Sequence, residues 1–242
     1  MCGRINMALD PADLVDELDI GHLSFEHRER YNVPPGGTVP IIVDRADPDG
    51  AVARRLEAAR WGLVPGWAKE LKIGYRAFNA RSESVRTKPM FRSAFDRQRA
   101  VLPVHAYYEW AKGPDGTQPW MMHATEHAHL LMAGLFEFKR LDADLRTEVG
   151  AHPAASSGWL VTATILTTAA QGHLVDVHDR MPVMLGADQV GEWLDPSAGA
   201  EAAEATLAGV IGSFDPEAVG RYRVGSAVGN VRNDGPEIAQ AV

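Results

Sequence analysis

Alternating apolar and polar positions divide most of this chain into short strands. The best candidates for buried strands are rich in β-branched and aromatic residues and occupy residues 120–124, 130–138 and 159–168. Weaker apolar runs predict further strands over residues 39–43, 59–64, 100–110 and 222–224. Strands and helices do not alternate regularly, so a doubly wound parallel sheet is not expected.

Helical patterns are fewer and shorter. Asp10 followed by Pro11 is typical of a helix N-terminus, with Asp10 as the N-cap. Two more helices are expected over residues 187–194 and 201–211, and Ser82 is a candidate N-cap within a polar, basic stretch. The pattern therefore predicts a single α+β domain over residues 1–242. Its core is a strongly bent, barrel-like, mostly antiparallel sheet flanked by short helices.

Composition agrees with a globular protein. Of the 242 residues, 45% are hydrophobic and 23% are charged, and no apolar run is long enough to span a membrane. The start of the chain lacks the basic and apolar segments of a secretory signal. A single cysteine forms no internal disulfide and provides no multi-cysteine zinc site. We therefore expect a cytoplasmic protein.

Charge is distributed unevenly along the chain. The net charge is -8, which by itself argues against a nucleic-acid partner. Residues 54–99, however, carry twelve Lys or Arg and four Asp or Glu, which leaves twelve basic and twenty-eight acidic residues elsewhere. A balance of +8 in one segment and -16 in the remainder suggests a local basic surface on an acidic body. A solvated face that binds nothing is the alternative.

Cys2 is the first candidate for chemistry. Removal of Met1, expected before a small second residue, leaves an α-amine and a thiol on the same residue. Their reference pKa values are about 7.7–8.0 and about 8.5, so both groups supply a nucleophilic fraction near neutral pH. The amine condenses with an aldehyde to an imine, and the thiol then closes a five-membered thiazolidine. Arg4 is expected to favour the thiolate. The alternative is a disordered chain end.

The segment FNARSESV at residues 78–85 is the second candidate. The amide of Asn79 donates and accepts hydrogen bonds, and the planar fork of Arg81 suits phosphate or carboxylate. Other cations surround the segment, including Arg86 and Lys88. The alternative is a turn that caps a helix beginning near Ser82.

Glu109, within YYEW at residues 107–110, is the third candidate. A carboxylate in an apolar strand is costly unless it is paired or used, and a pKa raised by burial suits a general acid or base. Strand alternation places Glu109 and Tyr107 on one face, and Tyr108 and Trp110 on the other. A glutamate on the solvent side of an edge strand is the alternative.

His178, within HDRMP at residues 178–182, is the fourth candidate, because histidine transfers protons near neutral pH. Asp179 and Arg180 either orient the ring or pair with each other, and a loop histidine with a local salt bridge is the alternative. No metal site is expected. His123, His127 and His129 are close in sequence, but they span a turn and lack acidic or thiol partners.

Taken in order, several motifs resemble the SRAP family, the SOS response-associated peptidases or abasic-site processing proteins. They run from MCGR at the N-terminus to NDGPE near residue 236, a span that covers the core of the expected domain. The other matching segments are YNVPP, WGLVPGWAK, NARSESV, KPMFR, LPVHAYYEW, AGLFE, TILTTAA and HDRMPVML.

The resemblance implies an activity and roles for particular residues. Family members crosslink to abasic sites in single-stranded DNA through a thiazolidine on the N-terminal cysteine, which shields the lesion, and they remove their own first residue. Cys2 corresponds to the nucleophile, Asn79 to the residue that holds its amine or the opened sugar, Glu109 to the general acid/base, and His178 to the proton donor and acceptor on the sugar oxygen. The implied DNA contacts are Arg4, Trp67, Arg81, Arg86, Lys88, Trp110 and, less directly, Thr167.

Two positions depart from the family pattern. His105 stands within Val-His-Ala where many relatives have Ala-Asp-Gly, and Ile5 replaces the usual aromatic residue after MCGR. Neither change removes a residue to which the resemblance assigns a catalytic role.

Three functions are consistent with these features. The first is a DNA-damage enzyme that acts without cofactor or metal, as a monomer in the cytoplasm, and associates with the nucleoid when bound to DNA. The second is a cysteine peptidase or amidohydrolase acting on other proteins, and the third is a non-covalent binder of single-stranded or modified DNA. Only the first explains why a thiol, an amine, Glu109 and His178 accompany the basic segment.

Overall fold

A computed structural model describes residues 2–24, 27–46, 50–114 and 116–242. Its strands are β1 (Ile5–Asn6), β2 (His22–Leu23), β3 (Thr38–Ala46), β4 (Val52–Trp61), β5 (Asn79–Arg81), β6 (Arg99–Val104), β7 (Ala106–Gly113), β8 (Gly116–Ala124), β9 (Leu130–Arg140), β10 (Ala155–Ser156), β11 (Trp159–Ala169), β12 (Arg180–Pro182), β13 (Met184–Leu185) and β14 (Val219–Arg223). Its α-helices are α1 (Pro11–Leu18), α2 (Arg92–Arg97), α3 (Ala143–Val149), α4 (Val190–Leu194) and α5 (Ala200–Ser213). Its 3₁₀ turns are η1 (Leu71–Arg76), η2 (Gly172–Asp176), η3 (Ala187–Gln189), η4 (Pro216–Ala218), η5 (Ser226–Gly229) and η6 (Pro236–Ala239).

Five strands close into a barrel in the order β3, β4, β11, β9 and β6, and β6 pairs back with β3. Most of these pairs are antiparallel, while β11 runs parallel to β4 and to the short strand β5. Apolar side chains from all five strands fill the interior, among them Ile41, Trp61, Leu102, Met132 and Ile165. The expected barrel-like, mostly antiparallel α+β fold is confirmed.

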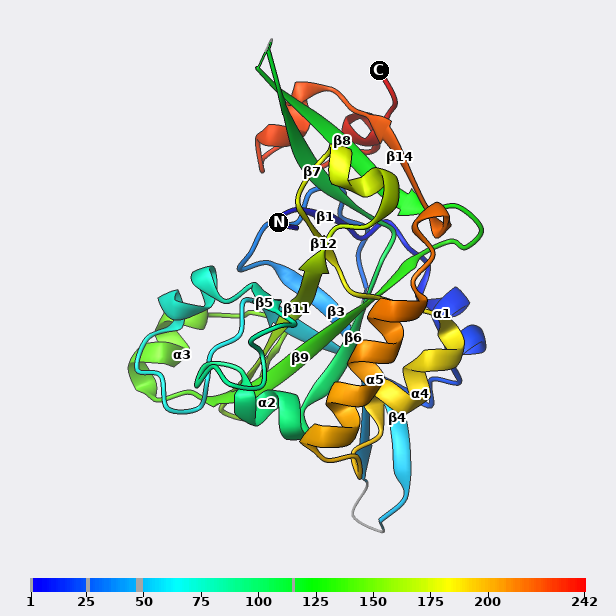
Figure 1. The fold of residues 1–242 in the computed structure, drawn as a ribbon. Coiled ribbons are helices and arrows are strands. Elements are labelled where there is room, and N and C mark those ends of the chain that lie inside the picture. The colour runs from blue at the N-terminus through cyan, green and yellow to red at the C-terminus, as the bar shows by residue number, and fades with distance from the viewer. Residues whose placement is uncertain (1, 25–26, 47–49, 115) are drawn as a thin grey trace.

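A second sheet stands at one end of the barrel, in the order β1, β7, β8 and β14 (Figure 1). The run at residues 100–110, expected as one strand, is two strands separated by a bend at His105. There the backbone N–H of His105 donates to Asn6 O at 3.0 Å, and the chain passes from the barrel into the second sheet. His105 therefore marks the junction between the two sheets.

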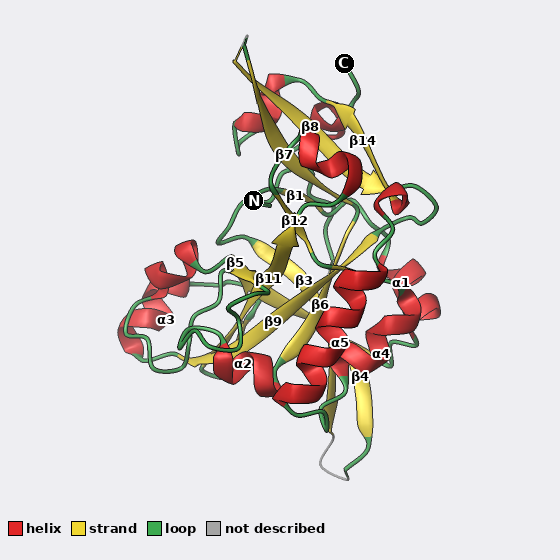
Figure 2. Cartoon of the chain, in the orientation of Figure 1, coloured by secondary structure: helices red, strands yellow, loops and turns green. Residues whose placement is uncertain are grey.

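Helices α1, α2, α4 and α5 cover one outer side of the barrel, and α3 lies apart from them in a separate lobe (Figure 2). Phe95 of α2, Trp193 of α4 and Leu207 of α5 pack with apolar residues from the outer faces of β3, β6 and β9. The helices expected over residues 187–194 and 201–211 correspond to η3 with α4 and to α5. These helices are too short to be stable by themselves. Their stability comes mainly from burial of this apolar layer against the barrel.

Local predictions at the N-terminal helix are confirmed, and two others are wrong. Asp10 caps α1, since its Oδ1 accepts from Ala12 N at 2.9 Å. Ser82 is not a helix N-cap, because it lies in a turn after β5 and its N–H donates to Thr167 O at 2.9 Å. The strand expected at residues 59–64 ends earlier, at Trp61, because Gly62 has a φ of +124° and lies against the Gly74 backbone.

Candidate active site

The beginning of the chain is folded into the second sheet. Cys2 is completely buried just before β1, and Ile5 pairs with Tyr107 of β7. Ile5 and Val33 exchange two backbone hydrogen bonds, at 3.1 and 2.9 Å, and Tyr108 N donates to Arg4 O at 2.9 Å. Backbone pairing of Arg4 and Ile5 fixes the segment that begins with the buried Cys2, which contradicts the alternative of a disordered chain end.

Asn79 contacts Cys2 directly. Its Nδ2 donates to Cys2 O at 2.6 Å, and β5 positions the residue by pairing Asn79 with Ile165 of β11. Asn79 Oδ1 is buried and has no hydrogen-bond partner among the described residues. Buried acceptors are usually satisfied, so this oxygen is a site where a bound molecule can donate a hydrogen bond. The alternative of a helix-capping turn is wrong, since Asn79 lies in a strand.

Glu109 is buried on the inner face of the second sheet. Its exposed fraction is 3%, which contradicts the solvent-edge alternative. Tyr107 packs in the same apolar cluster as Cys2, whereas Tyr108 and Trp110 pack with Val228 on the opposite face, as strand alternation predicted. Burial raises the pKa of the Glu109 carboxyl, and nearby positive charges, that of His178 among them, oppose the shift.

The Cys2 thiol is held in its neutral form. Burial raises the pKa of Cys2 well above its ordinary value, and the negative charge of Glu109 raises it further. A backbone hydrogen bond from Arg4 acts in the opposite direction without reversing the shift. The Arg4 guanidinium donates instead to Asn32 Oδ1 at 2.7 Å and to Val228 O at 2.8 Å. Arg4 thus favours the thiolate only through its backbone N–H, and burial together with the charge of Glu109 outweighs that effect.

His178 has a partner in each charge state. Its Nδ1 accepts from the backbone N–H of Arg180 at 2.9 Å, which in the neutral ring leaves the proton on Nε2. The same Nδ1 lies 2.8 Å from Asp179 Oδ1, which accepts from the ring when it is protonated. The side chain of His178 is 29% exposed, so it reaches the surface while it acts electrostatically on Glu109. This arrangement suits a residue that gains and loses a proton.

Arg180 joins the two segments that carry Asn79 and His178. Its guanidinium donates to both carboxylate oxygens of Glu83 and, at 2.6 Å, to the backbone oxygen of Thr167. The pair with Arg180 holds the pKa of Glu83 below its usual range. From the sequence, Arg180 is expected only to orient His178 or to pair with Asp179. Its position close after the histidine is the one signal of a larger role.

The cations implied to contact DNA near β5 lie at the surface. Arg81 is exposed on β5, and Thr167, which pairs with it on β11, is buried. Arg86 forms an ion pair with Glu204 of α5, and Lys88 is exposed nearby.

The remaining implied contacts occupy other parts of the surface. Trp67, 64% exposed, lines a separate cavity of about 480 Å³ together with Tyr75 and several charged residues. Arg4 stacks on Trp110 at 5.7 Å, on the face of the second sheet opposite Glu109. The structure thus brings the four candidate catalytic residues together more closely than the seven implied DNA contacts.

Neither a metal centre nor a membrane-crossing helix is found among the described residues. No group of three or more His, Cys, Asp or Glu in this part of the chain is arranged to hold a metal ion, and His129 pairs with Glu17 at 3.0 Å. None of the described helices is long and apolar enough to cross a membrane.

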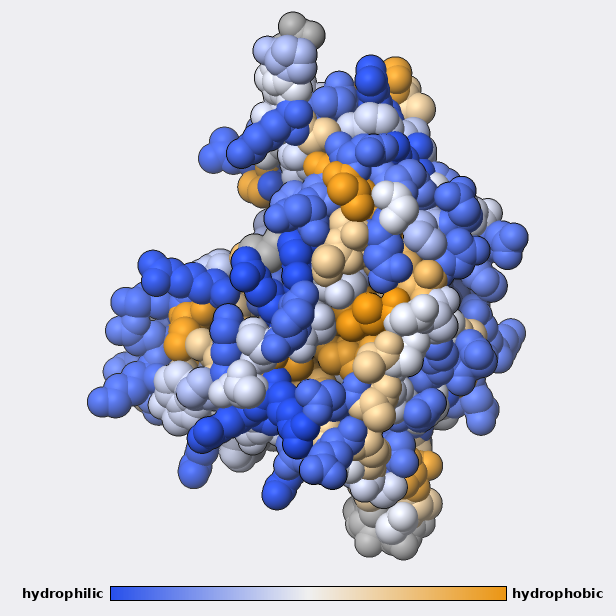
Figure 3. All heavy atoms as spheres, in the orientation of Figure 1, coloured by the Kyte–Doolittle hydropathy of each residue, from blue (hydrophilic) through white to orange (hydrophobic). Residues whose placement is uncertain are grey.

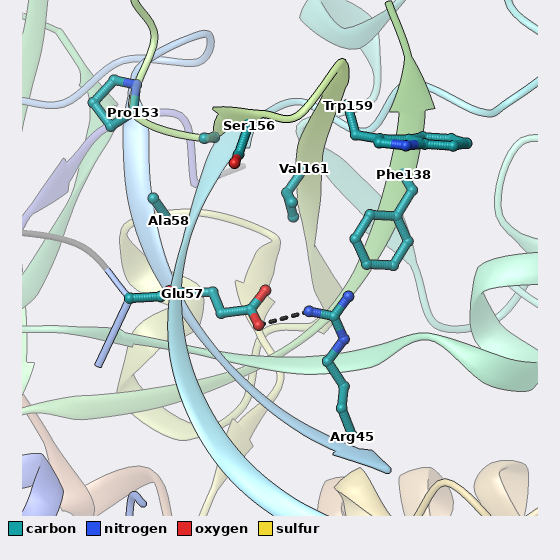
Figure 4. Close-up of a pocket in the computed structure, with 10 residues that line it drawn as sticks. Arg45, Glu57, Ala58, Phe138, Pro153, Ser156, Trp159 and Val161 are labelled. Atoms are coloured by element: carbon teal, nitrogen blue, oxygen red, sulfur yellow. Dashed lines mark hydrogen bonds and ion pairs between the residues drawn. The ribbon is translucent and has the colours of Figure 1, made fainter. Parts of the chain in front are cut away.

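A cavity of about 550 Å³ opens at the other end of β11 (Figure 4). Trp159 and Phe138 form its aromatic wall, and Arg45 donates to Glu57 at 2.6 Å along its floor. Val161, which lines the cavity, is four residues along β11 from Ile165, the partner of Asn79, a separation of about 13 Å at 3.3 Å per residue. The cavity is therefore separate from the site around Cys2, and its lining includes none of the four candidate catalytic residues.

The site around Cys2 combines four chemical capabilities. It offers a neutral thiol, a buried carboxyl group whose pKa is raised, a histidine with a partner in either protonation state, and an amide oxygen without a partner among the described residues. Such a set can transfer protons to and from an electrophile while the cysteine forms a covalent bond.

Comparison with known proteins agrees with the order of the motifs. The model of the SOS response associated peptidase (SRAP) family matches residues 1–231, and the chain belongs to this family.

Two curated bacterial relatives match along nearly their whole length. The abasic site processing protein YoaM of Bacillus subtilis is 33% identical over 244 residues, covering 100% of this chain and 98% of the relative. The abasic site processing protein YedK of Escherichia coli is 31% identical over 251 residues, covering 100% of both.

Solved structures share the fold. A Bacteroides thetaiotaomicron protein superposes with a TM-score of 0.77 at 21% identity and covers 100% of both chains. A phage-related protein of Bordetella bronchiseptica has a TM-score of 0.65 at 30% identity, covering 92% of this chain and 94% of that one.

Proposed function

We propose that this protein processes abasic sites in single-stranded DNA by forming a covalent thiazolidine through Cys2. The observation that carries the proposal is the environment of Cys2, which is buried, fixed by Asn79 through its carbonyl, and within electrostatic range of Glu109. The curated relatives named above are described as abasic site processing proteins, which supports an abasic site as the substrate. Met1 must be removed first to free the amine. That step consumes one water, and Met1 lies outside the described residues.

The proposed reaction balances without a cofactor. The sugar ring of the abasic site opens to an aldehyde, and the Cys2 amine attacks its carbon to give a carbinolamine. Loss of one water yields the imine. The Cys2 sulfur then bonds to the same carbon, the thiol proton leaves the sulfur, and the imine nitrogen ends as the N–H of the thiazolidine. The overall change is aldehyde plus aminothiol to thiazolidine plus water.

The raised pKa values of the Cys2 thiol and the Glu109 carboxyl determine the order in which the amine and the thiol react. Because the thiol is held neutral, the amine is the first nucleophile and the thiol reacts only after the imine has formed. Glu109 in its ionised form accepts the thiol proton, and in its acid form it donates a proton to the departing water. A carboxyl group whose pKa is raised by burial has both forms available closer to neutral pH than an exposed glutamate does.

His178 and Asn79 act on the sugar in this proposal. His178 transfers a proton to and from the ring oxygen during opening and during reversal of the crosslink. Asn79 holds Cys2 with its Nδ2, and its Oδ1 accepts from a hydroxyl of the opened sugar. Arg180 is a positioning residue, since it holds Glu83 and Thr167 between the segments that carry His178 and Asn79.

The wider DNA contacts follow the charge distribution. Arg81 and Lys88 are exposed cations for backbone phosphates, while Trp67 and Trp110 offer aromatic surfaces to unstacked bases. Arg86 contributes once its pair with Glu204 exchanges for a phosphate, and Arg4 acts through its stack on Trp110. We propose that the protein works as a monomer in the cytoplasm, bound to single-stranded DNA of the nucleoid.

A mass measurement tests the proposal. Purified protein is weighed intact, then again after incubation with a single-stranded oligonucleotide that contains one abasic site. We expect loss of Met1, followed by an adduct equal to protein plus oligonucleotide minus one water that survives denaturation. Cys2→Ser should form no thiazolidine. Retention of Met1 in the reactive protein, or an undiminished adduct with the variant, would overturn the mechanism.

The same preparation separates the two remaining functions. Hydrolysis of an unrelated peptide that is lost in Cys2→Ser would favour a peptidase or amidohydrolase. Binding to the oligonucleotide that disappears at high salt and leaves no adduct would favour a non-covalent binder.

A further inference from the structure

The register of the second sheet places a tryptophan and two arginines beside Glu109. Glu109 pairs with Trp120 of β8, and Trp120 pairs with Arg223 of β14, so the three residues form one row across three strands. In the neighbouring row, Tyr107 pairs with Met122 and Met122 pairs with Arg221. Directly opposed residues project from the same face of a sheet, which is here the face of Glu109.

Both guanidinium groups contact the ring of Trp120. Arg221 Cζ is 5.2 Å and Arg223 Cζ is 5.3 Å from the centre of its ring. Arg221 is anchored by Asp176, to which it donates at 2.7 Å. Arg223 is exposed, and within the described part of the chain no carboxylate forms an ion pair with it. One of the two stacked cations is therefore available to an anion from outside.

This arrangement borders a hollow in the sheet. A cavity of about 320 Å³ is lined by Ala111, Gln118, Trp120 and Arg223, with Lys112 at its rim. Ala111 follows Glu109 by two residues on the same face of β7, so the hollow continues the row that begins at the candidate active site. Figure 3 shows the molecule notched between this sheet and the lobe that carries α3, with a mostly hydrophilic rim.

We propose that Trp120 and Arg223 form a binding subsite for a nucleotide that flanks the abasic site on one side of the strand. The subsite rests on the proposed function. Arg223, with Lys112, contacts a backbone phosphate, and the exposed part of Trp120 contacts a base or its sugar.

The chemistry of the subsite fits single-stranded DNA better than a small anion. Single-strand binding combines cations that track the backbone with an aromatic surface that accepts any base. The protein as a whole carries a net charge of -8, so local cations are needed to hold a polyanion close to Glu109. Arg223 and Glu109 are two strand spacings apart, which is a distance of about 10 Å. At the rise of stacked bases, this distance corresponds to about two or three nucleotides.

A purely structural role makes a different prediction. If the stack only stabilises the second sheet, removing the exposed charge of Arg223 should change stability and leave DNA binding as it was. Arg223→Gln keeps the length and polarity of the side chain while removing its charge. Arg232→Gln is the matched control, because Arg232 is exposed in the C-terminal segment that packs on the opposite face of the sheet.

The first experiment measures binding of undamaged single-stranded oligonucleotides by fluorescence anisotropy over a range of salt concentrations. Arg223→Gln should weaken binding by about fivefold and lower the salt slope by about 0.7, as expected for one lost phosphate contact. Arg232→Gln should match the unmodified protein. The subsite would be overturned if Arg223→Gln bound as tightly as the unmodified protein, or if both variants lost the same amount of affinity.

The second experiment asks on which side of the lesion the subsite acts. Crosslinking rates are compared for oligonucleotides with nucleotides only 5′ or only 3′ of the abasic site. Arg223→Gln should slow one of these two substrates about fivefold and leave the other and the final adduct yield unchanged. Equal slowing of both would contradict a one-sided subsite. If the unmodified protein forms no adduct, the proposed function fails, while the anisotropy result still decides whether the subsite exists.

Discussion

The two ends of the barrel each hold a glutamate in a largely apolar setting, and they differ in what surrounds it. At the far end, Glu57 accepts from Arg45 at 2.6 Å within an open cavity of about 550 Å³. At the near end, Glu109 is 3% exposed, and burial raises its pKa although positive charges lie nearby. The far carboxylate faces an open cavity and pairs with Arg45, whereas desolvation raises the pKa of the near one and brings its proton exchange closer to neutral pH.

This difference shows that cavity size is a poor guide to chemistry in this protein. The far cavity is lined by strand residues, an ion pair and two serines, and Cys2 is not among its lining residues. The near site is built where three separate segments meet, carrying Cys2, Asn79 and His178 around the strand of Glu109. Convergence of reactive groups, rather than volume, distinguishes the two ends.

The largest effect is expected from Glu109→Gln. The amide is similar in shape but neither gains nor loses a proton near neutral pH, so crosslinking should slow by about 100- to 1,000-fold. Single-turnover rates on an abasic oligonucleotide measure the change. In the unmodified protein the rate should depend on pH through a pKa above that of an ordinary glutamate. If Glu109→Gln kept both the rate and this pH dependence, Glu109 would not be the proton-exchanging group, and its proposed difference from Glu57 would be contradicted.

A smaller loss is expected from Arg180→Lys. Lysine cannot hold both oxygens of Glu83 and the Thr167 backbone oxygen at once, so the segment that carries His178 should shift and the rate should fall by about tenfold. Arg97→Lys is the control, because Arg97 is exposed and its ion pair is with the adjacent Asp96. The effect should fall on the maximal rate more than on DNA affinity. Equal slowing by both variants would show that the loss is not specific to the contacts of Arg180.

Glu109 should also make stability depend on pH. Its pKa is raised in the folded state, so the folded protein binds the proton more tightly than the unfolded chain does. The stability contributed by this protonation is present below the unfolded pKa, near 4.3, and is lost as pH rises through the folded pKa. The loss amounts to about 1.4 kcal/mol for each pH unit that separates the folded pKa from the unfolded pKa. In urea unfolding, Glu109→Gln should therefore gain stability relative to the unmodified protein at pH 8, and lose this advantage at pH 4. A constant difference at both pH values would contradict burial of the charge.

The smallest effect is expected at the far end. Glu57→Gln should leave the crosslinking rate unchanged and lower the free energy of unfolding by about 1 kcal/mol, because it leaves Arg45 without its carboxylate partner. Urea unfolding and single-turnover crosslinking, measured on the same preparation, check the two halves of this prediction. A slower reaction would mean that the two ends of the barrel are coupled.

Much of the local structure could be predicted from the sequence because it depends on neighbouring residues. Asp10 with Pro11 specifies the start of α1, and the apolar runs of β9 and β11 specify buried strands. The boundaries that failed depend on distant contacts. Gly62 ends β4 where it meets the Gly74 backbone, and His105 breaks the run at residues 100–110 where the chain changes sheets. Neither contact is visible in a local pattern.

The candidate site divides in the same way. The order of the motifs was enough to identify Cys2, Asn79, Glu109 and His178 as candidate catalytic residues, because motif order depends only on residue types and their sequence. It could not show that Arg180 joins two segments of the site, or that Trp120 and Arg223 lie in one row with Glu109, because strand register is set by pairing across the sheet.

By itself, the sequence determined which functional groups the protein carries: a thiol that becomes an N-terminal aminothiol when Met1 is removed, a carboxyl group in an apolar strand, an amide and an imidazole. Only the tertiary structure decided the protonation of these groups and which of them lie close together. Burial raises the pKa values of both Cys2 and Glu109, and at Cys2 it outweighs the hydrogen bond from the Arg4 backbone, which favours the thiolate. The physical reason is that desolvation depends on what surrounds a group in space, and the residues beside Cys2 come from β5 and β7, far along the chain.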